Sequence, residues 1–168
     1  MSEFALGTVV FAKVPGLGIA KSRIAAATDA ATAARIYDEL LHCLAATLAD
    51  IPYAVAFTPA GDPGPLRSVF ADAHTFFAQP DTTLGGRLQQ ACDRTLEEGY
   101  LGFCALGCDC PDVQRDDLLE TRDRLARGTD VVLGPALDGG YYLAGCTVAG
   151  RVIFAAQQWS TPSLLEET

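Results

Sequence analysis

The sequence predicts an α/β protein, a three-layer α/β/α sandwich around a mostly parallel sheet. Short apolar runs of strand length alternate along the chain with longer segments whose apolar residues recur at helical spacing. The strand-like runs are apolar at consecutive positions, as expected where helices cover both faces of a sheet. This alternating order and two-sided burial together favour parallel strands joined by crossover helices.

Size and composition favour one globular domain. The 168 residues are 49% hydrophobic and 20% charged, which is enough for a core. The formal net charge of −9 argues against nucleic acid and membranes as partners, because both are bound by basic surfaces. No apolar run has the length of a membrane span and no signal pattern opens the chain, so we expect a cytoplasmic protein.

The first half of the chain contains two strands and two helical segments. Thr8–Ala12 is a continuous apolar run, typical of a buried strand, and a loop over residues 13–23 follows. Apolar residues at helical spacing predict a long helix between Asp29, a favourable N-cap, and Pro52. Tyr53–Thr58 is the second strand, and a Gly- and Pro-rich loop separates it from a short helix around Leu66–Phe70.

The second half repeats the alternation with shorter connections. Glycines at positions 99 and 128 are expected to end its two helices. The predicted strands are His74–Ala78, Leu101–Leu106, Asp130–Leu133 and Tyr141–Cys146, and the predicted helices are Leu84–Leu96 and Asp116–Arg127.

Two carboxylates, Asp109 and Asp112, stand between the strand Leu101–Leu106 and the next helix. Ligands in open α/β sheets bind beyond the carboxyl ends of the strands. Carboxylate oxygens there could hold a divalent metal, and the metal would bind phosphates. Alternatively, Asp112 caps the helix and Asp109 is a solvated turn acid. This stretch alone leaves both interpretations open.

The loop after the first strand, KVPGLGIAKSR, contains two glycines followed by Lys21 and Arg23. A Walker A loop ending at Lys21 would need glycine at positions 15 and 20, which hold Pro and Ala. A dinucleotide fingerprint starting at Gly16 would need glycine at position 21, so both named motifs fail. A glycine-containing turn with two cations beside a helix start still suits phosphate. The alternative is an ordinary loop with surface cations.

Two further turns have weaker signals. Ala136–Gly140 offers Asp138 beside paired glycines, which either let a ligand approach or form a tight hairpin, and the hairpin is preferred. Residues 159–162 (WSTP) could face a sugar or base, or cap a helix. With His42 and His74 as the two histidines of the sequence, nucleophilic catalysis is not indicated.

Six cysteines raise the question of a metal or of disulfides. No second C-x-x-C pair and no nearby histidine completes a zinc site, so we expect six reduced thiols. Three of them are expected at apolar positions, where cysteine acts as a small hydrophobe. These are Cys43, Cys92 and Cys104, and the other three are Cys108, Cys110 and Cys146.

Several stretches together resemble a known family: FAKVPGLGIAKSRI, LGGRL, LGCDCPD, DVVLGPALDGGYYLAG and WSTP. They are similar to the bacterial DUF2064 family of glycosyltransferase-A (GT-A) fold proteins, often labelled glycosyltransferases and related to the 2-phospholactate guanylyltransferases. The resemblance covers nearly the whole chain. It implies one GT-A-like domain over residues 1–168, of the nucleotide-diphospho-sugar transferase type.

The resemblance also implies roles for individual residues. Nucleotide and phosphate contacts are implied for Pro15, Gly16, Gly18, Lys21, Arg23, Gly139 and Gly140, catalytic roles for Lys21, Arg23 and Asp138, and metal binding for Asp109. Asp138, Gly139, Gly140 and Tyr141 would border the acceptor. The cationic loop and the acidic turn must then share one phosphate, so we expect the ends of the strands Thr8–Ala12 and Leu101–Leu106 to lie side by side.

The sequence also departs from the family pattern. Leu17 replaces the usual Pro, and Cys108 replaces the usual Thr or Ser. The sequence ends at Thr168, where relatives continue with a segment that can supply a second metal acid, so we expect that C-terminal segment to be missing.

The resulting expectation is a transferase, either a glycosyltransferase or a nucleotidyltransferase, with Mg²⁺ or Mn²⁺ as cofactor. Its substrates would be a nucleotide-sugar or nucleoside triphosphate and a small acceptor, and its oligomeric state is left open. The alternative is a non-catalytic nucleotide or metabolite binder with a degenerate transferase site.

Overall fold

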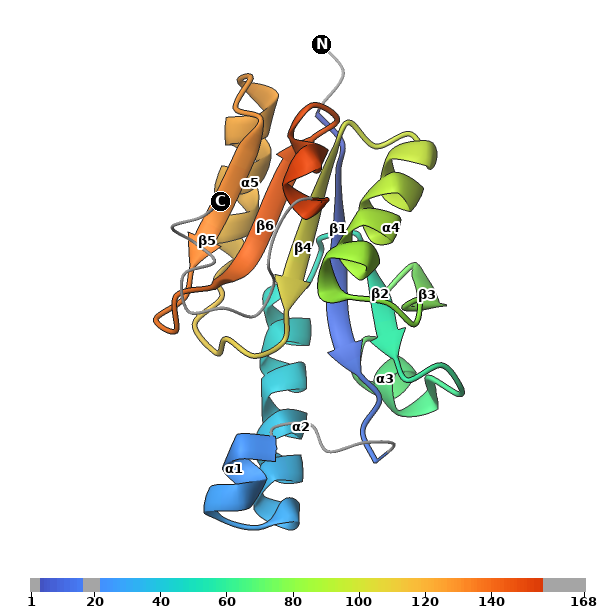
Figure 1. Cartoon of the computed structure of the whole chain (residues 1–168), viewed down its shortest axis with the longest axis vertical. Coiled ribbons are helices and arrows are strands. Elements are labelled where there is room, and N and C mark those ends of the chain that lie inside the picture. Colours follow the sequence, from blue (N-terminus) through green and yellow to red (C-terminus); the bar gives the residue numbers. More distant parts are fainter. Residues whose placement is uncertain (1–3, 17–21, 156–168) are drawn as a thin grey trace. The chain divides into compact units, whose positions relative to one another are not determined.

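The computed structural model describes residues 4–16 and 22–155 (Figure 1). Their strands are β1 (Leu6–Lys13), β2 (Tyr53–Thr58), β3 (Thr75–Ala78), β4 (Gly102–Gly107), β5 (Val131–Pro135) and β6 (Tyr141–Thr147). The helices are α1 (Ser22–Ala27), α2 (Ala30–Thr47), α3 (Gly64–Val69), α4 (Leu84–Glu97), α5 (Arg115–Ala126) and the short 3₁₀ helix η1 (Gly150–Phe154). Each predicted element is present, with its ends shifted by a few residues at most, and α1 and η1 are additions that the sequence pattern did not predict.

The six strands form one sheet in the order β3-β2-β1-β4-β6-β5. β2 and β3 are parallel, whereas β6 runs antiparallel to both β4 and β5. β6 is thus reversed relative to both of its neighbours. The predicted α/β fold, with a mostly parallel central sheet flanked by helices, is confirmed. No helix among the described residues is both long and apolar enough to cross a membrane.

The neighbouring strands β1 and β4 start at the same edge of the sheet. The N–H of Leu101 donates to the carbonyl oxygen of Ala5 at 2.9 Å, which joins the residues just before the two strands. The two strands therefore run in the same direction and end side by side. This confirms the expectation that the segment after β1 and the segment with Asp109 and Asp112 follow adjacent strand ends.

The chain divides into two compact units. Unit 1 comprises residues 1–9, 80–106 and 114–168, and unit 2 comprises residues 10–79 and 107–113. The single domain over residues 1–168 stays a prediction.

In unit 1, helices cover both faces of β6. The Cβ directions of Gly145 and Cys146 point to opposite faces of the sheet, because successive residues of a strand alternate between the two faces. The Sγ of Cys146 lies 3.8 Å from the Sγ of Cys92 on α4. A Cβ on Gly145 would lie 2.5 Å from the methyl group of Thr121 on α5. α4 and α5 thus pack on opposite faces of the sheet, which gives this unit its three layers.

The 3₁₀ helix η1 is packed against both β4 and α4. Phe154 of η1 and Phe103 of β4 are buried and make an edge-to-face contact with their ring centroids 5.7 Å apart. Arg151 Nη1 lies 3.4 Å from Asp93 Oδ1 on α4. Gly150 at the start of η1 is buried, and a Cβ there would overlap the carbonyl oxygen of Asp130.

In unit 2, the apolar face of α2 supplies much of the core. Its buried residues are Ala33, Tyr37, Leu41 and Leu44, all at helical spacing. α2 begins where the sequence predicts, because the Asp29 carboxylate accepts the N–H of Thr32 at 2.9 Å. At the other side of the unit, Tyr53 of β2 packs edge-to-face on Phe70.

Replacing Gly150 by Ala should destabilise the protein. The added methyl group meets backbone at Asp130, which cannot move cheaply, so we expect Gly150→Ala to lower the free energy of unfolding by about 1–3 kcal/mol. Urea denaturation measures this loss. Val152→Ala, at an exposed position of the same short helix, serves as the control and should change stability by no more than about 0.5 kcal/mol. Equal effects of the two changes would contradict the assigned contact.

The cap of α2 should depend on pH. Hydrogen bonds from the backbone and then the hydroxyl of Thr32 lower the pKa of Asp29 below its ordinary value of 3.8. Because the folded pKa is the depressed one, the stabilisation is present above pH 3.8 and is lost as the pH falls through the folded pKa. The melting temperatures of Asp29→Ala and the parent should therefore differ most at neutral pH and converge in acid. A difference that does not change with pH would show that the carboxylate is not the cap.

Candidate functional site

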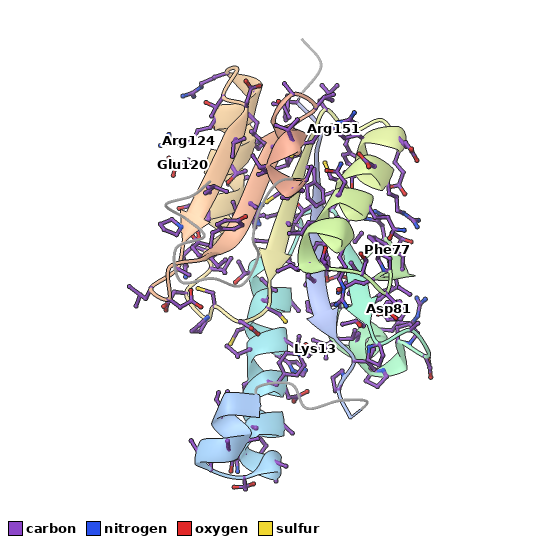
Figure 2. The ribbon with its side chains drawn as sticks, viewed as in Figure 1. Lys13, Phe77, Asp81, Glu120, Arg124 and Arg151 are labelled. Carbon is purple, nitrogen blue, oxygen red and sulfur yellow. The ribbon has the colours of Figure 1, made fainter. Side chains whose placement is uncertain are left out.

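The first part of the candidate site is the end of β1. Lys13, the last residue of the strand, is exposed (Figure 2). The next residue, Val14, is buried, and its N–H donates to the carbonyl oxygen of Thr58 at the end of β2, at 2.8 Å. Pro15 and Gly16 then turn the chain, and Gly16 has a φ of 82°, a conformation that favours glycine.

The second part is the segment Gly107–Val113 after β4, here called the acidic turn. Asp109 and Asp112 are exposed, whereas Cys108 and Val113 are buried. The two buried side chains thus anchor the turn, and the two carboxylates stand at the surface between them.

α2 holds both ends of the acidic turn. The hydroxyl oxygen of Tyr37 lies 3.5 Å from the Sγ of Cys108. The hydroxyl oxygen of Thr47 lies 3.3 Å from the carbonyl oxygen of Val113, and its one hydrogen is shared between this acceptor and the Cys43 carbonyl oxygen at 3.1 Å. Sequence reasoning treated α2 as core and missed both contacts, because nothing in a helical apolar pattern shows what a buried Tyr hydroxyl meets.

The hydroxyl of Tyr37 also reaches the end of β1. It accepts the N–H of Lys13 at 2.8 Å and donates to the Lys13 carbonyl oxygen at 2.9 Å. Burial, followed by the neighbouring Cys108, raises the pKa of Tyr37, so the phenol keeps its proton. Cys108 in turn places its Sγ 4.0 Å from Oδ1 of Asp109. One buried phenol therefore links the end of β1 to the residue next to Asp109.

The structure brings together only part of the predicted site. Pro15, Gly16 and Asp109 all belong to unit 2, and Tyr37 connects the segments that carry them. Gly18 and Lys21 lie outside the described residues. Arg23 belongs to α1, but its side chain also lies outside what the structure describes. The phosphate-binding roles of these residues stay predictions.

The turn at Ala136–Gly140 belongs to unit 1 and forms the hairpin between β5 and β6. The N–H of Ala136 donates to the carbonyl oxygen of Gly140 at 2.8 Å. Oδ1 of the exposed Asp138 accepts the N–H of Gly140 at 3.2 Å, and Gly139 has a φ of 85°. The hairpin interpretation is confirmed, whereas the functional roles of Asp138, Gly139 and Gly140 stay predictions. The WSTP motif lies outside the described residues.

Metal binding by Asp109 stays a prediction. Among residues 4–16 and 22–155, no group of three or more His, Cys, Asp or Glu side chains is placed to hold a metal ion. A closed protein site is therefore not formed by the described part of the chain. Mg²⁺, however, is commonly held by one or two carboxylates and by substrate phosphates. Asp109, exposed at the end of a strand, suits that arrangement.

Of the two interpretations left open for Asp112, the one in which it is the cap of the next helix is wrong. The N-cap of α5 is Gln114, and its backbone N–H donates to the carboxylate of Asp117 at 2.9 Å, as in a capping box. Asp112 precedes this cap by two residues.

The cysteines are all free, as expected. Cys92 and Cys104 are buried, as predicted, and burial raises the pKa of Cys104 to about 12. Cys43 is exposed, so its predicted apolar position is wrong. It lies on α2 between the buried Leu41 and Leu44, and a single step along a helix turns a side chain to another face.

A groove of about 410 Å³ lies elsewhere, in unit 1, between α5 and the strands β5 and β6. Its charged wall includes Glu120 and Arg124 (Figure 2), whose side chains pair with each other at 2.8 Å between Oε1 and Nε. No predicted site residue lines this groove. It therefore does not bear on the site at the end of β1.

The family described as "Uncharacterized protein conserved in bacteria (DUF2064)" matches residues 40–161. The chain belongs to this family. The match includes the acidic turn and the β5–β6 hairpin, and it starts within α2. The resemblance inferred from the DUF2064-like motifs is thus confirmed.

Solved structures agree with the DUF2064 assignment. A proposed nucleotide-diphospho-sugar transferase from Desulfovibrio desulfuricans G20 is 26% identical with a TM-score of 0.85, over 99% of this chain and 73% of that protein. A cytidylyltransferase from Leptospira borgpetersenii serovar Hardjo-bovis is 11% identical with a TM-score of 0.58, over 94% of this chain and 66% of that one. A 4-diphosphocytidyl-2C-methyl-D-erythritol synthase from Anaerococcus prevotii is 12% identical with a TM-score of 0.55, over 95% of this chain and 82% of that one. No curated protein matches the sequence.

These similarities give the chain a fold of the nucleotidyl- and glycosyltransferase type. The two cytidylyltransferase-like structures are too distant in sequence to show more than the fold.

The capping assignment can be tested with two neighbouring acids. Asp117→Ala removes the carboxylate bonded to Gln114 and should lower the free energy of unfolding by about 1 kcal/mol. Asp112→Ala should cost less, because Asp112 does not cap α5. Urea denaturation of both variants measures the difference, and a larger loss for Asp112→Ala would restore it as the cap.

Proposed function

We propose that the protein is a nucleotide-dependent transferase that takes a nucleoside triphosphate or a nucleotide-sugar and a small acceptor. The observation that supports this most is the joining of the β1 end and the acidic turn at one edge of the sheet by Tyr37. Ligands of open α/β sheets bind beyond the carboxyl ends of the strands. The similarity to a proposed nucleotide-diphospho-sugar transferase over 99% of the chain supports the same class of substrate.

In this proposal, the loop after β1 binds the phosphates. Backbone N–H groups of a glycine-containing turn suit phosphate oxygens. The proposed contacts come from Pro15, Gly16, Gly18, Lys21 and Arg23. Lys21 and Arg23 would stabilise the negative charge that develops on the leaving phosphate.

Asp109 is the proposed metal ligand. An exposed carboxylate at a strand end can hold Mg²⁺ or Mn²⁺ together with phosphate oxygens. The metal, when bound, would neutralise phosphate charge. The six free cysteines agree with a reducing, cytoplasmic environment for such an enzyme.

The family resemblance is the support for an acceptor-side role of Asp138, Gly139 and Gly140 in the β5–β6 hairpin. In the proposed transfer, a bond forms from an acceptor oxygen to the nucleotide phosphorus or to the sugar carbon. The bond to the pyrophosphate or nucleoside diphosphate leaving group breaks. The acceptor oxygen loses its proton to a general base, and the catalytic role proposed for Asp138 rests on the resemblance alone.

Asp109→Asn should remove metal-dependent nucleotide binding. Replacing a carboxylate by an amide keeps the shape and removes the charge, so we expect affinity for nucleotide with Mn²⁺ to fall by about tenfold or more, while affinity without metal stays as in the parent. Calorimetry with a panel of nucleoside triphosphates and nucleotide-sugars measures this. Asp112→Asn, at the other exposed acid of the same turn, is the matched control and should bind like the parent.

Three results separate the possibilities. Release of pyrophosphate or nucleoside diphosphate from the nucleotide donor, in the presence of a panel of acceptors, supports the enzyme and identifies the group that is transferred. Tight binding without any release would favour a non-catalytic binder. If Asp109→Asn binds Mn²⁺ and nucleotide as the parent does, the metal site is not at Asp109.

A further inference from the structure

Tyr37 presents a polar group in a fully packed environment. The residue lies in the middle of α2 and is 3% exposed. Burying a hydroxyl without partners costs about 1–3 kcal/mol. Here the hydroxyl has partners on two separate backbone segments, Lys13 at the end of β1 and Cys108 in the acidic turn. The hydroxyl of Tyr37 therefore connects the end of β1 to the acidic turn, and a phenylalanine at this position could not do so.

The phenol and the thiol of this cluster have one hydrogen each. The Tyr37 hydroxyl donates to the Lys13 carbonyl oxygen at 2.9 Å. At the 3.5 Å contact between Tyr37 and Cys108 either atom could be the donor, and the thiol donates when the phenol hydrogen is on the Lys13 carbonyl. The same thiol lies 4.0 Å from Oδ1 of Asp109 and has one hydrogen, so the longer contact competes with the shorter one.

The backbone of Lys13 faces the acidic turn because of its position in β1. The next residue, Val14, directs its N–H to Thr58 at the end of β2. The N–H and carbonyl of Lys13, one residue earlier, both point instead to the Tyr37 hydroxyl. The phenol thus occupies the place that a partner residue of another strand would take at the end of β1. Thr47 on the same helix holds the far end of the acidic turn, through Val113.

We propose that Tyr37 is a positioning residue of the nucleotide site, and that its hydroxyl sets the distance between the end of β1, residues 13–16, and Asp109 so that both segments bind one phosphate group. This inference rests on the proposed function. Tyr37 itself is buried and is not proposed to contact the ligand. It acts through the backbone of Lys13 and through Cys108.

Tyr37→Phe tests the inference, because it removes the hydroxyl and keeps the ring. We expect the affinity for ATP, CTP, GTP or UTP with Mn²⁺, whichever the parent binds, to fall by about 10- to 100-fold, since small misplacements of binding groups cost that much. The affinity for the matching nucleoside, which has no phosphate, should stay unchanged. A role limited to stability would not separate these two ligands. Calorimetry on the folded variant measures both.

Tyr53→Phe is the matched control. Tyr53 is 1% exposed, lies in the same unit, and packs its ring on Phe70 as a buried aromatic residue. Removing its hydroxyl makes the same chemical change away from the site. This variant should bind triphosphate like the parent, whatever stability it loses.

Two variants of Cys108 give a second test that does not depend on Tyr37→Phe folding. Cys108→Ser keeps a donor for the phenol oxygen and should retain triphosphate affinity. Cys108→Ala removes the donor and should lower that affinity without changing affinity for the nucleoside. Equal binding by Cys108→Ala and Cys108→Ser would count against the linkage.

The outcomes for the inference and for the proposed function are distinct. If the parent binds triphosphate and Tyr37→Phe binds it equally well, Tyr37 is not a positioning residue and the proposed function stands. If the parent binds neither any of the four triphosphates nor a nucleotide-sugar, the proposed function is wrong, and this inference is then wrong too. Selective loss of triphosphate affinity in Tyr37→Phe, with Tyr53→Phe normal, supports both.

Discussion

The parallel pairing of β1 with β4 is the constraint on which the candidate site depends. Two neighbouring strands that start at the same edge must also end at the same edge, so the loops that follow them meet there. Residues almost a hundred positions apart in the sequence, Lys13 and Asp109, thereby come to lie around one buried hydroxyl. α2 then adds what the strands do not supply, a fixed support for the acidic turn at Cys108 and Val113.

The net negative charge of the protein restricts how it can bind a phosphate-containing ligand. A chain with a formal net charge of −9 repels phosphates at long range, so any phosphate site must be built locally from backbone N–H groups, cations or a metal. The acidic turn is compatible with this requirement only if a cation shares it. The metal that we propose at Asp109, held jointly with a nucleotide, would supply this cation.

Close packing in unit 1 depends on the absence of side chains at particular points. Gly145 lets Thr121 of α5 approach β6, and Gly150 lets η1 approach the carbonyl of Asp130. On the opposite face of β6, Cys146 meets Cys92 of α4. Small residues thus decide how near each helix comes to the sheet, and the layers of the unit follow from them.

The sequence by itself determined the family, the start of α2 at Asp29, and the order and type of the elements other than α1 and η1. Local physics decides these features, since apolar periodicity, capping residues and turn glycines act over a few positions. Only the tertiary structure decided that Gln114 and Asp117, and not Asp112, begin α5, because several nearby polar residues can compete for one helix end. The same is true of Cys43, which a helical turn carries to the surface. The role of Tyr37 could not be predicted for a similar reason: its sequence position shows an apolar face of a helix, whereas the partners of its hydroxyl belong to two distant segments that only folding brings together.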